Sequence, residues 1–366
     1  MSIQHVLSIP LFAFMLLAGA CTTAIKDSGE TPTALPCYIV YNAGSSGTRL
    51  FIYRQTAAGW VTHRGPQTGA LADPVRAIRG QTMADAADVV GRIVNSLEGM
   101  RQDGPANKNG APAWPAFDWL DQCDIKAAAV YATAGMRLAE ELDPAASELL
   151  WQLLNDRLSS TLGMDVTTRT ISGYEEGLFA WLAIGEGRED NNFGIAEMGG
   201  ASVQITFPCE DCEGAKPVRA GAHNVALYSD SFLGWGQDEA WKKFRPLPAC
   251  ARGAGRLNPQ WQATDCQAGM MLESDAVDSI EARVANRPGL HWYLSGAFRY
   301  MRETDIEQFC RQGIDSGFQP ETSCFRAIYL QKVLSRLGLP DGAEQSAVDW
   351  TLGAVLCTAT RCREVQ

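Results

Sequence analysis

Two segments of the chain, about 155 residues apart, share one pattern of apolar and polar positions. In the first, residues 39–53, an apolar run is followed by Asn42, one spacer, a glycine, small residues and a second apolar run. The second, residues 194–207, repeats this order with Glu197 in the place of Asn42. Each pattern predicts two β-strands joined by a turn whose backbone N–H groups can bind a phosphate. The repeat indicates a duplicated lobe, although ordinary Gly-rich hairpins would look alike.

The segment between these hairpins predicts further strands and helices. Ala127–Tyr131 is a buried-type strand that leads into a helix at Thr133, whose hydroxyl could bind a phosphate or cap the helix. Helical spacing extends over residues 82–100 and over residues 143–158. The second of these helices has a good N-cap in Asp143, followed by a proline at its first position.

Two adjacent acids, Glu175 and Glu176, stand at the start of another predicted helix, whose apolar positions fall within residues 178–182. The helix dipole favours carboxylates in a first turn, which would explain both acids without any chemistry. A glutamate between glycines and a buried aromatic face can instead act as a general base. The local pattern leaves these two interpretations open.

Length and charge narrow the class of protein. The chain has 366 residues, enough for about two domains, and a formal net charge of −11. This charge argues against a nucleic-acid-binding protein, which needs a basic surface. A site for an anionic substrate must therefore be made attractive locally, by backbone N–H groups and a bound cation.

The first residues predict export. In residues 1–20 an apolar run from Val6 to Leu17, too short to cross a bilayer comfortably, ends in small residues, as in a signal peptide. The sequence "LAGAC" resembles a bacterial lipobox with Cys21 as the lipidated residue, and cleavage after "AGA" is the alternative. Residues 21–36 are polar and predict a flexible tether. We expect an exported bacterial protein, either a periplasmic or cell-surface lipoprotein, which meets the membrane only through its lipid, or a secreted protein.

Cysteine usage supports the same expectation. Eleven cysteines are present, and ten remain when Cys21 is set aside. Ten cysteines in an exported chain predict a set of disulfides, although sequence does not fix their connectivity. The close spacings, with two cysteines left over, are Cys209/Cys212, Cys250/Cys266, Cys310/Cys324 and Cys357/Cys362, and then Cys37 and Cys123. A zinc site at "CEDC" is the alternative for the first pair, and it would need two further ligands.

Five segments, taken in order, resemble the motifs of the apyrase family, the ecto-nucleoside triphosphate diphosphohydrolases. They are "NAGSSGTR", "ATAGMR", "ISGYEEGLFAWLAIG", "EMGGASVQ" and "WTLGA". Their order and spacing agree with the family from Cys37 onward. The resemblance implies an α/β fold of two actin-like, ribonuclease-H-like lobes with a cleft between them. We expect lobe I over residues 37–172, lobe II over 173–345, and a C-terminal segment, 346–366, that returns to lobe I.

The resemblance also implies roles for the matched residues. Glu176 would be the base that activates the attacking water, and Ser202 and Gln204 would hold that water. A divalent ion, Ca²⁺ or Mg²⁺, would be held through water by Asn42 and Glu197. The residues implied to contact the substrate are Ser45, Ser46, Gly47, Thr48, Thr133, Ala134, Gly199, Gly200, Ala201 and the cleft residue Trp350. The expected substrates are nucleoside tri- and diphosphates, whose terminal phosphate is hydrolysed.

Two positions depart from the family pattern. The family presents Asp at both metal-associated positions, where this chain has Asn42 and Glu197. We therefore expect weakened metal binding. Asn42 favours one alternative to the hydrolase, a catalytically weak nucleotide-binding protein of the same fold. An exopolyphosphatase on that fold is a separate alternative. Trp235, Trp292 and Tyr300 are candidates for a nucleobase pocket, but we expect each of them in the core.

Overall fold

The computed structural model describes residues 34–76, 84–107, 109–244, 247–250, 260–270, 289–300, 306–312, 322–339 and 342–364, with isolated positions between 271 and 288. The expected signal peptide, Cys21 and nearly all of the tether lie outside the described residues. Within the described ranges, no helix combines the length and apolar character that crossing a bilayer requires.

The first sheet contains the N-terminal hairpin. Its strand order is β3-β2-β1-β4-β5, with β1 antiparallel to β2 and parallel to β4. The strands are β1 (Leu35–Gly44), β2 (Gly47–Thr56), β3 (Gly59–Thr68), β4 (Cys123–Ala132) and β5 (Val166–Thr170). Its helices are α1 (Ala86–Gly99), α2 (Trp119–Gln122), α3 (Ala134–Leu142) and α4 (Pro144–Leu162). The Asp143 side chain caps α4 and a proline opens it, as predicted.

The second sheet repeats this plan. Its order is β11-β10-β6-β7-β9-β8, and β6 is antiparallel to β7 and parallel to β10. The strands are β6 (Phe193–Met198), β7 (Ser202–Pro208), β8 (Lys216–Ala220), β9 (His223–Leu233), β10 (His291–Gly296) and β11 (Glu344–Gln345). The helices and 3₁₀ turns between its strands β9, β10 and β11 are α6 (Gln237–Phe244), η2 (Pro248–Cys250), α8 (Ala263–Ala268), η3 (Ala297–Tyr300), α10 (Ile306–Gln312) and α11 (Ser323–Arg336). The predicted duplication is therefore present in the topology of both sheets.

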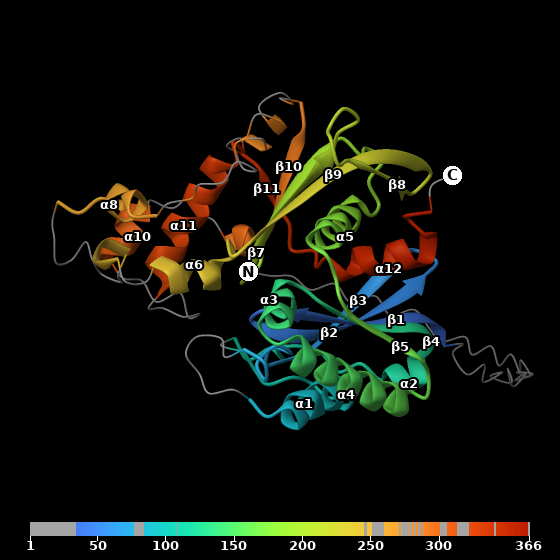
Figure 1. The fold of residues 1–366 in the computed structure, drawn as a ribbon. Coiled ribbons are helices and arrows are strands. Elements are labelled where there is room, and N and C mark those ends of the chain that lie inside the picture. The colour runs from blue at the N-terminus through green and yellow to red at the C-terminus, as the bar shows by residue number, and fades with distance from the viewer. Residues whose placement is uncertain are drawn as a thin grey trace, which may run out of the picture. The chain divides into compact units, whose positions relative to one another are not determined.

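Two helices form a layer shared by the sheets, namely α5 (Gly173–Gly185) and α12 (Thr351–Thr360). Figure 1 shows them between the sheet that carries β1 and the sheet that carries β9. Their apolar residues pack with Val40 and Phe51 of the first sheet and with Ile195 of the second. Gly353 permits the close approach of the helices, since a Cβ there would lie 1.8 Å from the carbonyl oxygen of Phe179.

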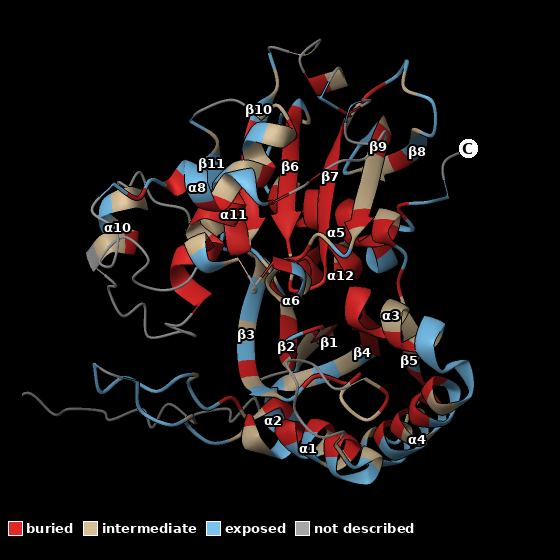
Figure 2. Cartoon of the chain, turned by 60° about the vertical axis from the view of Figure 1, so that its left-hand side comes forward, coloured by how far each residue is buried: buried red, intermediate tan, exposed pale blue. Residues whose placement is uncertain are grey.

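The alternation of side chains along the strands decides which residues face this shared layer. In β1, Ile39 and Tyr41 pack against the outer helices, whereas Val40 packs toward α5 and α12. In β7, Val203 and Ile205 face the outer core of the second sheet. Because successive side chains of a strand point to opposite faces, their polar neighbours in sequence point toward α5. Figure 2 shows that β6 and β7 are buried along most of their length.

All ten cysteines expected to be oxidised form disulfides. The two cysteines that were left over form the disulfide Cys37–Cys123, which joins β1 to the start of β4. Each of the four closely spaced pairs forms its own disulfide: Cys209–Cys212, Cys250–Cys266, Cys310–Cys324 and Cys357–Cys362. The zinc alternative at "CEDC" is wrong, because the disulfide uses both thiols that a metal would need. The lobe boundaries remain a prediction; the two sheets are built from residues 35–170 and 193–345.

Candidate active site

The turns of the two hairpins open into one cavity of about 970 Å³. Most of the predicted site residues line it. They are Asn42, Ser45, Ser46, Gly47, Thr133, Ala134, Glu176, Glu197, Gly199, Gly200, Ala201, Ser202 and Trp350. Thr48 and Gln204, buried at 1% and 0% exposure, are not among the lining residues. Gln204 still reaches the site through its side-chain amide, as described below.

Small residues are required where the hairpin turns meet. A Cβ on Gly200 would lie 2.4 Å from Ser45 Oγ and 2.6 Å from a carboxylate oxygen of Asp238. A Cβ on Gly135 would lie 2.7 Å from the Cα of Ser45. The turns of both hairpins and the start of α3 are therefore in contact. Thr133 is the N-cap residue of α3, but its side chain makes no capping hydrogen bond, so the capping interpretation of Thr133 is not realised.

The structure separates the two acids at the start of α5. Glu175 forms a capping box with Ser172 and is also paired with Arg169 at 2.8 Å and Arg363 at 2.7 Å. Burial alone would raise the pKa of Glu175, but the hydrogen bonds from Arg169 and the Ser172 backbone outweigh it and hold the pKa at about 2. Glu175 is thus the structural carboxylate of the pair.

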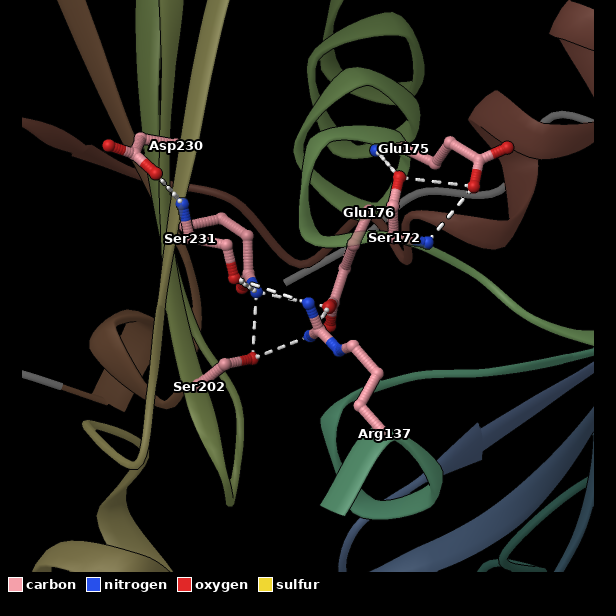
Figure 3. Close-up of polar contacts among 8 residues, drawn as sticks. Arg137, Ser172, Glu175, Glu176, Ser202, Asp230 and Ser231 are labelled. Carbon is pink, nitrogen blue, oxygen red and sulfur yellow. Dashed lines mark hydrogen bonds and ion pairs between the residues drawn. The ribbon is translucent and has the colours of Figure 1, made fainter. Parts of the chain in front are cut away.

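Glu176 instead points into the cavity and lies at the centre of a polar cluster (Figure 3). Its Oε2 accepts hydrogen bonds from Arg137 Nη2 at 2.8 Å and from Gln204 Nε2 at 3.0 Å. Gln204 also lies 2.7 Å from the hydroxyl of Ser202 and 3.0 Å from that of Ser231. Burial raises the pKa of Glu176 to about 7, against the opposing influence of Arg137. A carboxyl group with a pKa near neutrality is suited to accept a proton.

Glu197, from the second hairpin, is 8% exposed, and its Oε2 has no hydrogen-bond partner among the described residues. Burial, followed by the nearby charges of Glu176 and Asp349, raises the pKa of Glu197 well above its usual range. Ser295, its neighbour in β10, is likewise buried with an unpartnered hydroxyl. Unsatisfied buried oxygens are costly, so this part of the cavity is suited to bind a cation or polar ligand.

Asn42, from the first hairpin, faces a carboxylate that sequence reasoning missed. Its Nδ2 donates hydrogen bonds to both oxygens of Asp349, each at 3.1 Å. Asp349 lies in the cavity wall immediately before Trp350 and α12. The oxygens of Asn42, Glu197 and Asp349 are hard donors of the kind that Ca²⁺ and Mg²⁺ prefer. The residues present therefore fit a divalent cation.

Arginines supply positive charge locally in a chain of net charge −11. Arg49, Arg299 and Arg326 all line the cavity. Arg326 is paired at 2.7 Å with Asp238, and both side chains are buried. Such guanidinium groups are well matched to phosphate oxygens.

The three aromatic candidates for a nucleobase pocket differ in how far their side chains are exposed. Trp292 is 3% exposed and belongs to the core of the second sheet, as expected, and Trp235 packs against the same core. The expectation for Tyr300 was wrong: its side chain is 67% exposed and lines the cavity beside Arg299. Tyr300 ends a short 3₁₀ turn after β10, where the chain leaves the sheet and packing no longer covers the ring.

Arg137, Asp349 and Ser231 are among the site residues that were not assigned from sequence. Arg137 stands in the quoted "ATAGMR" segment and Asp349 directly precedes "WTLGA", so both are adjacent to motifs. Ser231 lies in β9, opposite Gln204 in the strand register. Proximity to a motif was the available signal for the first two residues. Ser231 begins "SFLGWGQDEA", which also resembles a segment of the apyrase family.

Comparisons with known proteins show which family the chain resembles. The GDA1/CD39 (nucleoside phosphatase) family model matches residues 120–327, more than half of the chain. Nucleoside-triphosphatase ntp-1 of Caenorhabditis elegans is 24% identical over 85% of this chain and 69% of its own length. Ectonucleoside triphosphate diphosphohydrolase 2 of Mus musculus is 27% identical over 69% of this chain, and the match spans 51% of that relative. This chain therefore spans about half the length of the mammalian enzyme.

Solved structures support the fold. An exopolyphosphatase from Cytophaga hutchinsonii superposes with a TM-score of 0.53 at 12% identity, covering 89% of this chain and 98% of that one. A Ppx/GppA phosphatase from Aquifex aeolicus gives 0.51 at 13% identity, covering 88% and 99%. At these identities the likeness concerns architecture alone, and it confirms the predicted two-lobed α/β fold. From the family match and the site together, the chain belongs to the GDA1/CD39 (nucleoside phosphatase) family.

Proposed function

We propose that this protein hydrolyses the terminal phosphoanhydride bond of nucleoside tri- and diphosphates, in a reaction that depends on a divalent cation. The observation that carries the proposal is the placement of Glu176. Its buried carboxyl group, with a pKa of about 7, opens into a cavity shared by two phosphate-sized hairpin turns. The names of the relatives, which include a nucleoside-triphosphatase and triphosphate diphosphohydrolases, support the choice of substrate.

Different groups in the cavity have different roles in the reaction. Glu176 accepts a proton from a water molecule, whose oxygen attacks the terminal phosphorus as the bond to the leaving phosphate oxygen breaks. Ser202 and Gln204, hydrogen-bonded to each other at 2.7 Å, hold the water beside the base. The N–H groups of the two turns and the cavity arginines stabilise the charge on the transferring group.

A divalent cation, Ca²⁺ or Mg²⁺, would neutralise phosphate charge and fix the orientation of the substrate. The residues that would hold it are Glu197 and the pair formed by Asn42 and Asp349. Exposed Tyr300, beside Arg299 in the cavity wall, offers a ring face on which a nucleobase could stack.

A phosphate-release screen tests the proposal. We expect release from ATP and ADP with Ca²⁺ or Mg²⁺, none from AMP, and loss of release when a chelator is added. Nucleotide binding without turnover would instead support the catalytically weak binding protein. Faster release from polyphosphate than from any nucleotide would support an exopolyphosphatase.

We also propose that the protein is exported and anchored through a lipid on Cys21. The apolar run that ends in "LAGAC" and the polar stretch after it support this. Stable anchoring would need more than one acyl chain. Replacing Cys21 with Ser should move the protein from the membrane to the soluble fraction, whereas a soluble and lipid-free wild type would contradict the proposal.

A further inference from the structure

The contact between Asn42 and Asp349 joins residues 307 positions apart in the sequence. A side-chain amide can turn either its oxygen or its nitrogen outward, and here the nitrogen faces the carboxylate, since only the nitrogen can donate. Asn42 therefore does not present a charge of its own. It fixes both oxygens of a carboxylate that comes from another part of the chain.

A purely structural role explains only part of this arrangement. Asp349 Oδ1 also accepts hydrogen bonds from the backbone N–H and the hydroxyl of Thr351, at 3.1 and 2.8 Å, and so steadies the start of α12. An asparagine would serve that purpose about as well. The helix dipole favours a negative charge at this position. Neither role explains why Asn42 holds both oxygens of the carboxylate in the cavity wall.

An independent observation indicates that a ligand binds beside this carboxylate. Glu197 lines the same cavity with a buried Oε2, and Ser295 beside it has a buried hydroxyl; neither oxygen has a partner in the part of the chain that the structure describes. Asp349 lines the same cavity. Two carboxylates that face one cavity repel each other, and a cation bound between them relieves the repulsion.

We propose that Asp349 is the second cation-binding carboxylate of this site, and that Asn42 is a positioning residue that holds it. Asn42 thus stands at the position in the first hairpin where the family has an acid, and the negative charge comes from Asp349, in the segment before α12. The inference rests on the proposed cation-dependent function, but it concerns binding and can be tested without turnover.

Calorimetric titration of the whole protein with Ca²⁺, in the absence of nucleotide, tests the assignment. Asp349→Asn keeps the shape and the oxygen that accepts from Thr351 and removes the charge, so we expect Ca²⁺ affinity to fall by about 10–100-fold. The double variant Asn42→Asp, Asp349→Asn exchanges amide and carboxylate at constant charge. It should recover affinity to within about threefold of wild type, because the two sites are coupled.

Glu344→Gln is the matched control. It removes one carboxylate from exposed β11, five residues before Asp349 and outside the cavity lining, and it should leave Ca²⁺ affinity unchanged. Circular dichroism and the urea midpoint verify that every variant is folded.

The outcomes separate this inference from the proposed function. Wild-type affinity in Asp349→Asn, no recovery in the folded double variant, or no Ca²⁺ binding by wild type would each overturn the assignment. Phosphate release from ATP is measured in parallel on wild type. Absence of release with intact, Asp349-dependent Ca²⁺ binding would overturn the hydrolase and leave the cation site standing.

Discussion

The hairpins β1–β2 and β6–β7 hold equivalent places in their sheets, yet their polar residues meet different surroundings. The side-chain N–H of Asn42 is shared between the two oxygens of Asp349, whereas Glu197 is itself an acid and has an oxygen without a partner among the described residues. The backbone repeat therefore does not imply a repeat of charge. In a duplicated fold, the charge at one copy can come from a segment outside the copy.

The two sheets also differ in how they are cross-linked. The first has one disulfide, Cys37–Cys123, which joins strands 86 residues apart. Around the second, three bridges span separations of 3, 16 and 14 residues. A bridge over a long loop restricts the unfolded chain more than a short one does. The first sheet thus depends on one long-range link, while the second has several local ones.

The largest expected effect comes from the base that lies between the hairpins. Glu176→Gln keeps the shape of the side chain and removes its basicity, so phosphate release from ATP should fall by about 10²–10⁴-fold. Initial rates at saturating cation, with the fold checked by circular dichroism, measure the loss.

Glu175→Gln is the control for this substitution. Glu175 is held by its capping box and by Arg169 and Arg363, so its replacement should lower the urea midpoint of unfolding. Turnover should stay within a few fold of wild type, because Glu175 does not face the cavity. Equal losses of turnover in both variants would show that Glu176 is not the general base.

Breaking the long-range disulfide tests the contrast between the sheets. Chain entropy predicts that replacing both Cys37 and Cys123 with Ala lowers the free energy of unfolding by about 4 kcal/mol, against about 2 kcal/mol for Cys209 and Cys212. Urea unfolding of the two double variants gives the comparison. A larger loss for the local pair would show that loop length does not decide their contributions.

Replacing Asn42 with Asp gives both hairpins an acidic side chain at the equivalent position. Asn42→Asp gives up two hydrogen bonds to Asp349 and sets two like charges against each other, so stability without a cation should fall by about 1–3 kcal/mol. Added Ca²⁺ should restore it, with an affinity about tenfold above wild type. Thermal unfolding against Ca²⁺ concentration measures both effects, and an unchanged Ca²⁺ dependence would contradict them.

The smallest expected effect concerns pH. Because Glu176 acts as a base only when ionised, the rate should rise with pH through about 7. Arg137 favours the ionised form and so lowers the pKa of Glu176. Arg137→Gln should therefore raise that pKa and move the rising limb to higher pH, with a greater loss of rate at acidic than at alkaline pH. Equal losses at every pH would make Arg137 a residue that acts through structure alone.

Local features of the fold were predictable because neighbouring residues encode them. The apolar runs around Asn42 and Glu197 mark their hairpins, and Asp143 with its following proline marks the start of α4. The ten cysteines were expected to be oxidised, but sequence left the partner of Cys37 open because pairing depends on how β1 meets β4.

Site residues that meet only through the tertiary fold were not predictable. Asp349 contacts Asn42 across 307 positions, and Ser231 reaches Gln204 because β9 pairs with β7. Tyr300 was expected in the core because aromatic residues usually are buried, whereas the end of the 3₁₀ turn exposes its ring. No local pattern contains these relations.

The position of α12 between the two sheets has a consequence for the order of events during synthesis. Both sheets and Glu176 are encoded before residue 346, yet α12 and Asp349 complete the core layer and the cavity wall. A growing chain that folds from its N-terminus can form the first sheet early, but it must leave the apolar side of α5 uncovered until α12 is made. The cavity therefore takes its final form only after nearly all of this sequence has left the ribosome, so a nascent chain carries both hairpins for some time without an assembled site.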